Sequence, residues 1–224
     1  MSWFLLVGLG AVVALDATSF GQLMLSRPLV AGTLAGAIVG QPLEGALVGA
    51  TLEALSLGIM PVGAAKYPET GTAAVLAVGT LGLSGLPPTA TAFLLTLAYG
   101  VVWQSLSGAT VVAGRYINEW LVQAGRGVIA KRMDRMIERR HVGAMILDLV
   151  RGVLVTSAGL AFGVPLLRQA LPLWNLPAVV AAGAVAVAAV TVLAGNARIF
   201  ADNRRGAMLL AAGVLGGSAL LFLR

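Results

Sequence analysis

The sequence predicts an all-α, polytopic membrane protein that contains a broken helical hairpin. Hydrophobic residues make up 58% of the 224 residues, charged residues make up only 11%, and the mean hydropathy is +0.93. A soluble domain carries about 25% charged residues, so this chain offers too little polar surface for water. Long apolar segments alternate with basic clusters, and a membrane-spanning helix needs about 20 apolar residues. The lipid bilayer is therefore the predicted environment.

Charge and composition also exclude several kinds of function. The chain has no cysteine, which excludes disulfides, thiolate metal ligands and cysteine catalysis. Of its fifteen Lys and Arg residues, eight lie within 115–151 and three within 198–205. Basic clusters between apolar segments are typical of cytoplasmic loops, and no basic face with interleaved aromatic residues indicates nucleic-acid binding. We expect no cofactor, no metal and no nucleic-acid partner.

The first apolar segments are too short to cross a bilayer. Trp3–Leu15 ends at Asp16, and the next two segments, Leu29–Gly40 and Leu43–Leu57, are joined by a Gly-Gln-Pro step. Each of these two holds about 12 to 15 residues, or roughly 18 to 22 Å at about 1.5 Å per residue, against a hydrocarbon core of about 30 Å. They form either a re-entrant hairpin, which commonly marks the substrate site of a transporter, or one long helix kinked at Pro42.

Glycine spacing favours the hairpin. Gly32, Gly36 and Gly40 recur every four residues before the break, and Gly45 and Gly49 repeat that spacing after it. In a helix, residues four apart share a face, and a glycine face lets a second backbone approach closely. The alternative explanation is the general glycine richness of the chain, which contains 29 glycines.

The rest of the chain is divided by its charges. Four segments are long or nearly long enough to span the bilayer: Thr89–Gly114, Gly152–Leu167 with its flanks, Pro177–Ala197 and Gly206–Leu223. Two crossings separate the basic clusters, with Arg168–Leu176 as the outer turn, so both clusters are expected to face the cytoplasm. Within the first cluster, Gly127–Arg140 has the pattern of an amphipathic surface helix. The predicted organisation is an N-terminal membrane half (1–114) with a candidate substrate hairpin (29–71), a basic cytoplasmic or interfacial segment (115–151) and a C-terminal membrane half (152–224).

Ionisable residues at membrane depth are candidate functional residues, because burying them in lipid is costly unless they pair or face a cavity. Glu53 lies among the apolar residues of Leu47–Leu57. Either it forms a structural pair with Lys66 or Arg27, or it accepts hydrogen bonds from a polar solute. The turn-rich segment Gly58–Gly71 is either an extramembrane loop or an irregular chain whose backbone groups face a ligand.

Catalytic motifs are missing from the sequence. His141 lies beside two arginines in the basic segment and is interpreted as a solvent-exposed residue, not as a phosphoryl acceptor. The sequence contains no P-loop, HExxH or GxSxG motif. We therefore expect no catalytic residue in this chain.

Three stretches resemble a known family, the IIC components of mannose/fructose/sorbose-type sugar phosphotransferase systems. They are LDATSFGQLMLSRPLVAG (Leu15–Gly32), GQPLEGALVGATLEALSLGIMPVGAAKYPETG (Gly40–Gly71) and YGVVWQSLSGATVVAGRYIN (Tyr99–Asn118). The resemblance covers roughly half of the chain and fades after Asn118. Two features depart from the family pattern: the C-terminal half is short, and Lys66 stands where a small or apolar residue is usual.

The resemblance implies a multi-pass sugar permease subunit in the bacterial cytoplasmic membrane, with an elevator-type architecture. Family members act with a related IID membrane subunit, and a soluble IIB protein, charged by IIA, phosphorylates the sugar. The candidate substrate-binding residues are Glu53, Glu69, Gln104, Lys66, Thr70, Asp16, Gln22 and Arg27. Two other functions remain open: a secondary permease without phosphoryl transfer, and a non-transporting membrane subunit that senses or holds a partner.

Overall fold

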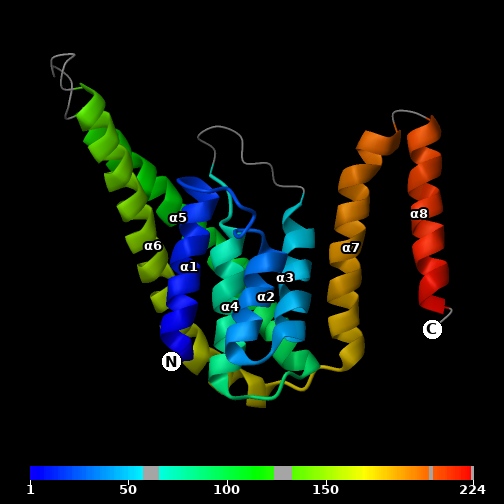
Figure 1. The fold of residues 1–224 in the computed structure, drawn as a ribbon. Helices are drawn as coiled ribbons and strands as arrows, with labels where there is room; N and C mark the ends of the chain where they lie inside the picture. The colour runs from blue at the N-terminus through cyan, green and yellow to red at the C-terminus, as the bar shows by residue number, and fades with distance from the viewer. Residues whose placement is uncertain (58–65, 124–132, 202–203, 223–224) are drawn as a thin grey trace.

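The computed structural model describes residues 1–57, 66–123, 133–201 and 204–222, and these residues form helices joined by short connections (Figure 1). In chain order the α-helices are α1 (Ser2–Thr18), α2 (Pro28–Val39), α3 (Pro42–Ser56), α4 (Thr70–Ser84), α5 (Ala90–Gln123), α6 (Met133–Ala170), α7 (Ala178–Ala201) and α8 (Arg204–Phe222). A short 3₁₀ helix, η2 (Leu171–Leu173), follows α6. The predicted all-helical fold is confirmed.

The helices α2 and α3 form the expected hairpin. Proline occupies the first position of each helix, where its missing N–H costs no hydrogen bond. Gly40 ends α2 in the left-handed conformation with φ at 78°, which is costly for a residue with a side chain. The chain then reverses, so that α2 and α3 lie side by side (Figure 1). The alternative of one long kinked helix is wrong.

Glycines hold the two arms of the hairpin together. A Cβ atom at Gly32 would lie 2.7 Å from the Gly45 carbonyl oxygen and 3.1 Å from the Gly49 Cα. A Cβ atom at Gly36 would lie 3.0 Å from the Gly45 Cα. Side chains at these positions would push the backbones apart, as the four-residue spacing predicted.

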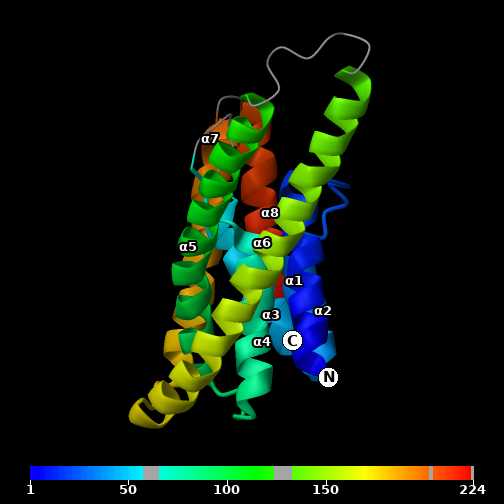
Figure 2. The ribbon, with the colours of Figure 1, turned by 90° about the vertical axis from the view of Figure 1, so that its left-hand side faces the viewer.

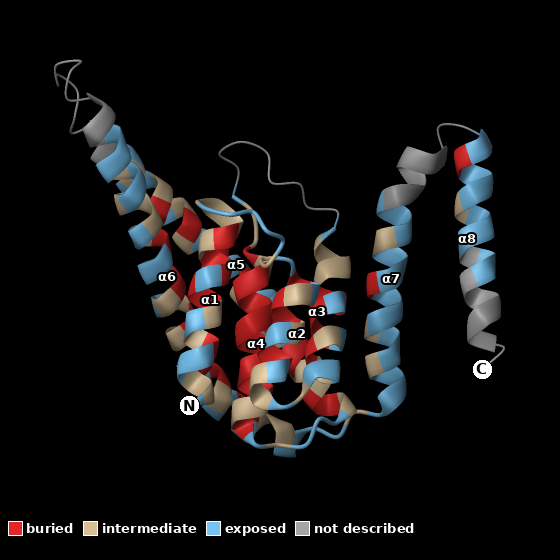
Figure 3. Cartoon of the chain, viewed as in Figure 1, coloured by how far each residue is buried: buried red, intermediate tan, exposed pale blue. Residues whose placement is uncertain are grey.

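Helix α4 is the centre of the molecule, and the sequence analysis did not identify it. Nearly all of its residues are buried (Figure 3), and it contacts α1, α2, α3, α5 and α6. Its small residues permit this close packing: a Cβ atom at Gly79 would lie 2.9 Å from both Leu6 and Leu160. Leu76 of α4 and Leu52 of α3 belong to this hydrophobic core, and both are fully buried.

All four predicted spanning segments fall in helices, and the fourth, Gly206–Leu223, lies largely within α8. Three described segments are long and apolar enough to cross a membrane: Ala90–Trp120, Ile137–Leu173 and Ala178–Gly195. Helices α5 and α6 continue past the end of the bundle formed by α1 to α4 (Figures 1 and 2). Helices α7 and α8 stand at the edge, where α7 contacts α3 and α5, and α8 contacts α7.

The basic segment 115–151 is divided between two helices. Its first residues belong to α5, and residues 133–151 belong to α6. The predicted amphipathic helix Gly127–Arg140 lies partly outside the described residues, because 124–132 are not described. The end of α5 and the start of α6 lie at the same end of the molecule as the start of α8 (Figure 1), so the structure agrees with the two basic clusters lying on one side.

The turn expected at Arg168–Leu176 starts later than predicted. Arg168 still belongs to α6, and its guanidinium donates hydrogen bonds to the Ser84 and Leu83 carbonyl oxygens at 3.0 and 3.1 Å. These bonds satisfy carbonyl groups at the end of α4. Arg168 therefore joins two helices, and the irregular turn runs from Leu171 to the start of α7.

Candidate substrate site

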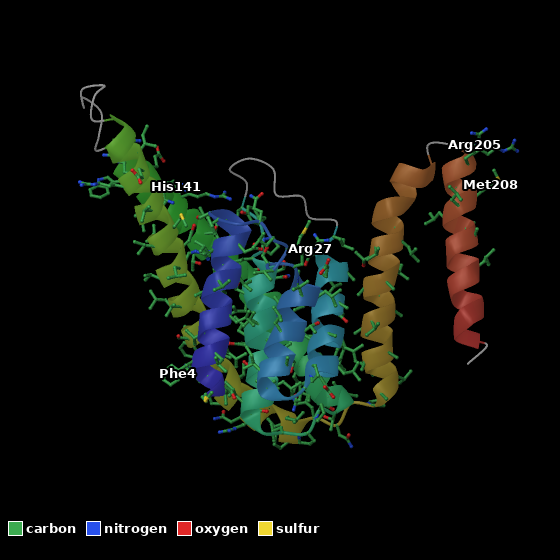
Figure 4. The ribbon with its side chains drawn as sticks, in the orientation of Figure 1. Phe4, Arg27, His141, Arg205 and Met208 are labelled. Atoms are coloured by element: carbon green, nitrogen blue, oxygen red, sulfur yellow. The ribbon has the colours of Figure 1, made fainter. Side chains whose placement is uncertain are left out.

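A cavity of about 220 Å³ opens where the ends of α1, α2, α3 and α4 meet. Its lining residues come from these helices and their flanks: Ala17, Ser26, Arg27, Pro28, Glu53, Ser56, Leu57, Tyr67, Pro68, Glu69, Thr70 and Gly71. The cavity lies at the end of the hairpin away from its tip, where Arg27 is labelled in Figure 4. Sites for drug-sized ligands measure about 300–1,000 Å³, so this cavity suits a smaller solute.

Glu53 and Arg27 form an ion pair in the cavity wall. Arg27 Nη2 lies 2.9 Å from Glu53 Oε1, and the Leu29 N–H donates to Glu53 Oε2 at 3.0 Å. Glu53 thus places its negative charge at the N-terminus of α2, where the unpaired N–H groups and the helix dipole favour an anion. The Glu53 side chain is 18% exposed and that of Arg27 is 48% exposed. Both groups therefore remain accessible to a solute.

Of the two partners considered for Glu53, the structure selects Arg27. Lys66 is exposed, does not line the cavity and, within the described part of the chain, pairs with neither Glu53 nor Glu69. The turn Pro61–Ala65, which belongs to the family pattern, lies outside the described residues.

Asp16 organises the loop that carries Arg27. Its carboxylate is 4% exposed and accepts the N–H groups of Leu23 at 2.5 Å and Ser26 at 2.9 Å. These bonds fix a tight loop in which Gln22 adopts a positive φ of 48°. Asp16 and Gln22 lie outside the cavity lining, and Gln22 is exposed. Asp16 thus acts on the cavity by positioning Ser26 and Arg27.

Glu69 is held by a buried arginine that the sequence analysis placed elsewhere. Arg151 donates to both Glu69 carboxylate oxygens, Nη1 to Oε2 at 2.7 Å and Nη2 to Oε1 at 2.9 Å. The Ser107 hydroxyl also donates to Oε2. The side chains are 3% exposed for Glu69 and 7% for Arg151. The assignment of Arg151 to an exposed basic cluster is therefore wrong, because this guanidinium is buried between α4 and α6.

The ion pair belongs to a network that joins four helices. Asp148 lies 3.4 Å from Arg151, and its Oδ2 accepts the Thr18 hydroxyl of α1 at 2.9 Å and the Ser19 hydroxyl. Arg151 also donates to the Thr110 hydroxyl of α5 at 3.2 Å. The guanidinium thus lies between two carboxylates, and four hydroxyls bond either to it or to those carboxylates. A signal was present in the sequence, because Asp148 and Arg151 stand one helical turn apart beside an apolar segment.

The other predicted residues divide into two groups. Thr70 begins α4 and lines the cavity. Gln104 is 9% exposed and does not line the cavity, but its backbone carbonyl accepts the N–H of the lining residue Glu69 at 2.9 Å. The Gln104 side-chain oxygen has no hydrogen-bond partner among the described residues. Sequence reasoning missed Ser26, Ser56 and Tyr67. Single serines, and a tyrosine within the turn-rich segment Gly58–Gly71, carry no distinctive signal of a binding site.

The chemistry of the lining suits a small, uncharged polyhydroxylated solute. Carboxylates accept hydrogen bonds, guanidinium and backbone N–H groups donate them, and serine and threonine hydroxyls do both. Among the described residues, no group of three His, Cys, Asp or Glu side chains is placed to hold a metal ion. His141 is exposed near the start of α6, a helix that does not line the cavity, and it lies apart from Arg27 in Figure 4.

Comparisons with known proteins identify the family and the fold of the chain. The chain matches, over residues 1–201, the family described as the PTS system sorbose-specific IIC component. A solved structure described as "Structure of membrane protein" has a TM-score of 0.62 and 21% sequence identity, over 99% of this chain and 94% of that one, and so shares its fold. No curated protein matches the sequence significantly. The chain is thus a membrane-embedded sugar permease subunit that acts with other phosphotransferase components, and it belongs to the family of the PTS sorbose-specific IIC component.

Proposed function

We propose that the 220 Å³ cavity is the sugar site, and that this subunit carries a hexose-like sugar across the bacterial cytoplasmic membrane. A partner IIB protein then phosphorylates the sugar on the cytoplasmic side. The observation that carries this proposal is the Glu53 carboxylate, which lies at the end of a half-length apolar helix and lines the cavity. Burying a carboxylate at membrane depth is costly unless it is paired or faces a cavity, so such a residue commonly marks a functional site.

The hydrogen-bonding groups of the cavity come from three segments of the chain. Glu53 and Ser56 belong to α3, Ser26 and Arg27 precede α2, and Thr70 begins α4. A hexose presents hydroxyls around its whole ring, and each hydroxyl both donates and accepts. The site is therefore suited to a sugar bound through the hydroxyls around its ring, with Glu53 as the main hydrogen-bond acceptor.

We also propose that the site moves as a unit, as in an elevator mechanism. All twelve lining residues lie between Ala17 and Gly71, so none comes from α5 to α8. The glycine contacts between α2 and α3 make the hairpin compact, and α4 packs directly against it. Because α5 and α6 hold the lining residue Glu69 through Gln104 and Arg151, they would belong to the same body, and its displacement would carry the sugar with it. The cytoplasmic side would be the end at which α5, α6, α7 and α8 carry their basic residues.

Sugar binding to the purified chain in lipid nanodiscs tests the assignment. Glu53→Gln removes a charged acceptor, and we expect binding weaker by about 1.5–3 kcal/mol, or about 13- to 160-fold. Glu44→Gln is the matched control, because Glu44 lies at the opposite end of the same helix, outside the cavity. Unchanged affinity in a folded Glu53→Gln protein would remove Glu53 from the site.

Phosphoryl coupling needs a separate experiment in vesicles. We expect the chain with its IID, IIB and IIA partners to deliver phosphorylated sugar, and the chain alone to deliver none. Transport of unmodified sugar by the chain alone would instead support a secondary permease. Binding without transport under either condition would support a sensing subunit.

A further inference from the structure

Tyr67 is the aromatic residue of the cavity lining, and Arg115 of α5 lies over its ring. The side chain is half-buried and lines the cavity. The guanidinium carbon of Arg115 lies 5.2 Å from the centroid of the Tyr67 ring, within cation–π distance. Arg115 does not line the cavity. The guanidinium therefore lies over one face of the ring from outside the cavity lining.

The backbone around Tyr67 is also held by α5. The Glu69 N–H donates to the Gln104 carbonyl oxygen at 2.9 Å. A Cβ atom at Gly108 would collide with the Tyr67 carbonyl oxygen and would lie 3.3 Å from the Pro68 Cα. The absence of a side chain at Gly108 thus allows this segment to lie directly on α5.

These three contacts come from one face of α5. Positions 104, 108 and 115 are separated by four and seven residues, which are close to whole turns of a helix with 3.6 residues per turn. The same face therefore holds the Glu69 N–H, accommodates the Tyr67–Pro68 backbone and supports the Tyr67 ring. Such support fixes the orientation of a side chain that otherwise belongs to an irregular segment.

We propose that Tyr67 is the platform on which a pyranose ring of the substrate stacks, with Arg115 as its positioning residue. This proposal rests on the proposed sugar site and adds a reason why that site would select a closed sugar ring over an open chain. Aromatic faces carry partial negative charge, and one face of a pyranose presents several polarised C–H groups together. The carboxylates and hydroxyls of the cavity recognise hydroxyls, which an open-chain polyol also offers. Tyr67 is the lining group that distinguishes a closed ring from an open chain.

The test compares D-mannose and D-glucose with D-sorbitol, by equilibrium binding to the full chain in nanodiscs. Tyr67→Leu removes the aromatic face, so it should weaken pyranose binding about 2- to 13-fold and leave sorbitol binding unaltered. Tyr67→Phe keeps the ring and should keep the preference for pyranoses over sorbitol. Arg115→Met should reduce that preference, and Arg115→Lys, which keeps the cation, should reduce it less. Tyr116→Leu is the control, since Tyr116 is the exposed neighbour of Arg115.

A second measurement does not depend on any variant folding. Saturation-transfer NMR on the wild-type chain, with irradiation of aromatic protons, should label the C–H protons of one pyranose face preferentially. Even labelling of both faces, or an equal loss of pyranose and sorbitol binding in Tyr67→Leu, would overturn the stacking proposal while leaving the sugar site in place. A wild-type chain that binds none of these sugars, nor L-sorbose or D-fructose, would overturn both.

Discussion

Removing the guanidinium of Arg151 should destabilise the protein more than removing any other single charge near the cavity. Arg151 makes two hydrogen bonds to Glu69, at 2.7 and 2.9 Å, and the two side chains are 7% and 3% exposed. In Arg151→Met the Glu69 carboxylate stays buried without its cation. Breaking a buried ion pair in this way costs about 3–5 kcal/mol, mainly because the remaining charge is uncompensated.

A double-mutant cycle separates the pair from its surroundings. Glu69→Gln combined with Arg151→Met leaves no isolated charge between these two residues, so we expect the double variant to be less destabilised than the sum of the single variants. Arg27→Met is the matched control, because its pair with Glu53 is 48% and 18% exposed and such pairs contribute about 0–1 kcal/mol.

The assay is chemical or thermal unfolding of the purified chain in a mild detergent, with the same detergent for all variants. We expect the order of stability to be wild type, Arg27→Met, the double variant and Arg151→Met. If Arg151→Met is no less stable than Arg27→Met, the buried ion pair of Arg151 and Glu69 does not hold α6 to α4. Our account of that pair as a stabilising contact would then be wrong.

Two further predictions concern the hairpin and the topology. Gly45→Ala should lower the free energy of unfolding by about 1–3 kcal/mol, the cost of overpacking, because its Cβ would meet the Gly32 carbonyl oxygen. Gly8→Ala, which has open space around it, should show no such loss in the same unfolding assay. Single cysteines at His141 and Arg205, both exposed at one end of the molecule (Figure 4), should react with an impermeant thiol reagent from the same side of sealed vesicles. Reaction from opposite sides would contradict the predicted topology.

The hairpin was predictable because its signals are local. Proline at the start of each arm, Gly40 at the break and glycines every four residues describe backbone geometry within one stretch of chain. The Glu53–Arg27 pair followed from the same stretch, as one of two alternatives. Such features depend on residues close in sequence, so sequence patterns report them well.

Helix α4 and Arg151 were missed because their structure depends on distant residues. The sequence of Thr70–Ser84 is short for a spanning helix, and it is helical and buried because five other helices surround it. Arg151 pairs with a residue 82 positions earlier in the chain. In the sequence Arg151 was grouped with the basic residues of 115–151, and the nearby Asp148 was the one local signal of a buried pair. The pairing of Arg151 with Glu69 depends on tertiary packing, which that pattern does not report.

The most direct test of the central claim is a structure of the chain with its phosphotransferase partners and a bound sugar. We predict that the sugar occupies the 220 Å³ cavity, with a hydroxyl within hydrogen-bonding distance of the Glu53 carboxylate and one ring face against Tyr67. A sugar bound instead in the mostly apolar groove between α5 and α6, which is lined by Trp103, Leu106 and Leu154 among others, would contradict the account.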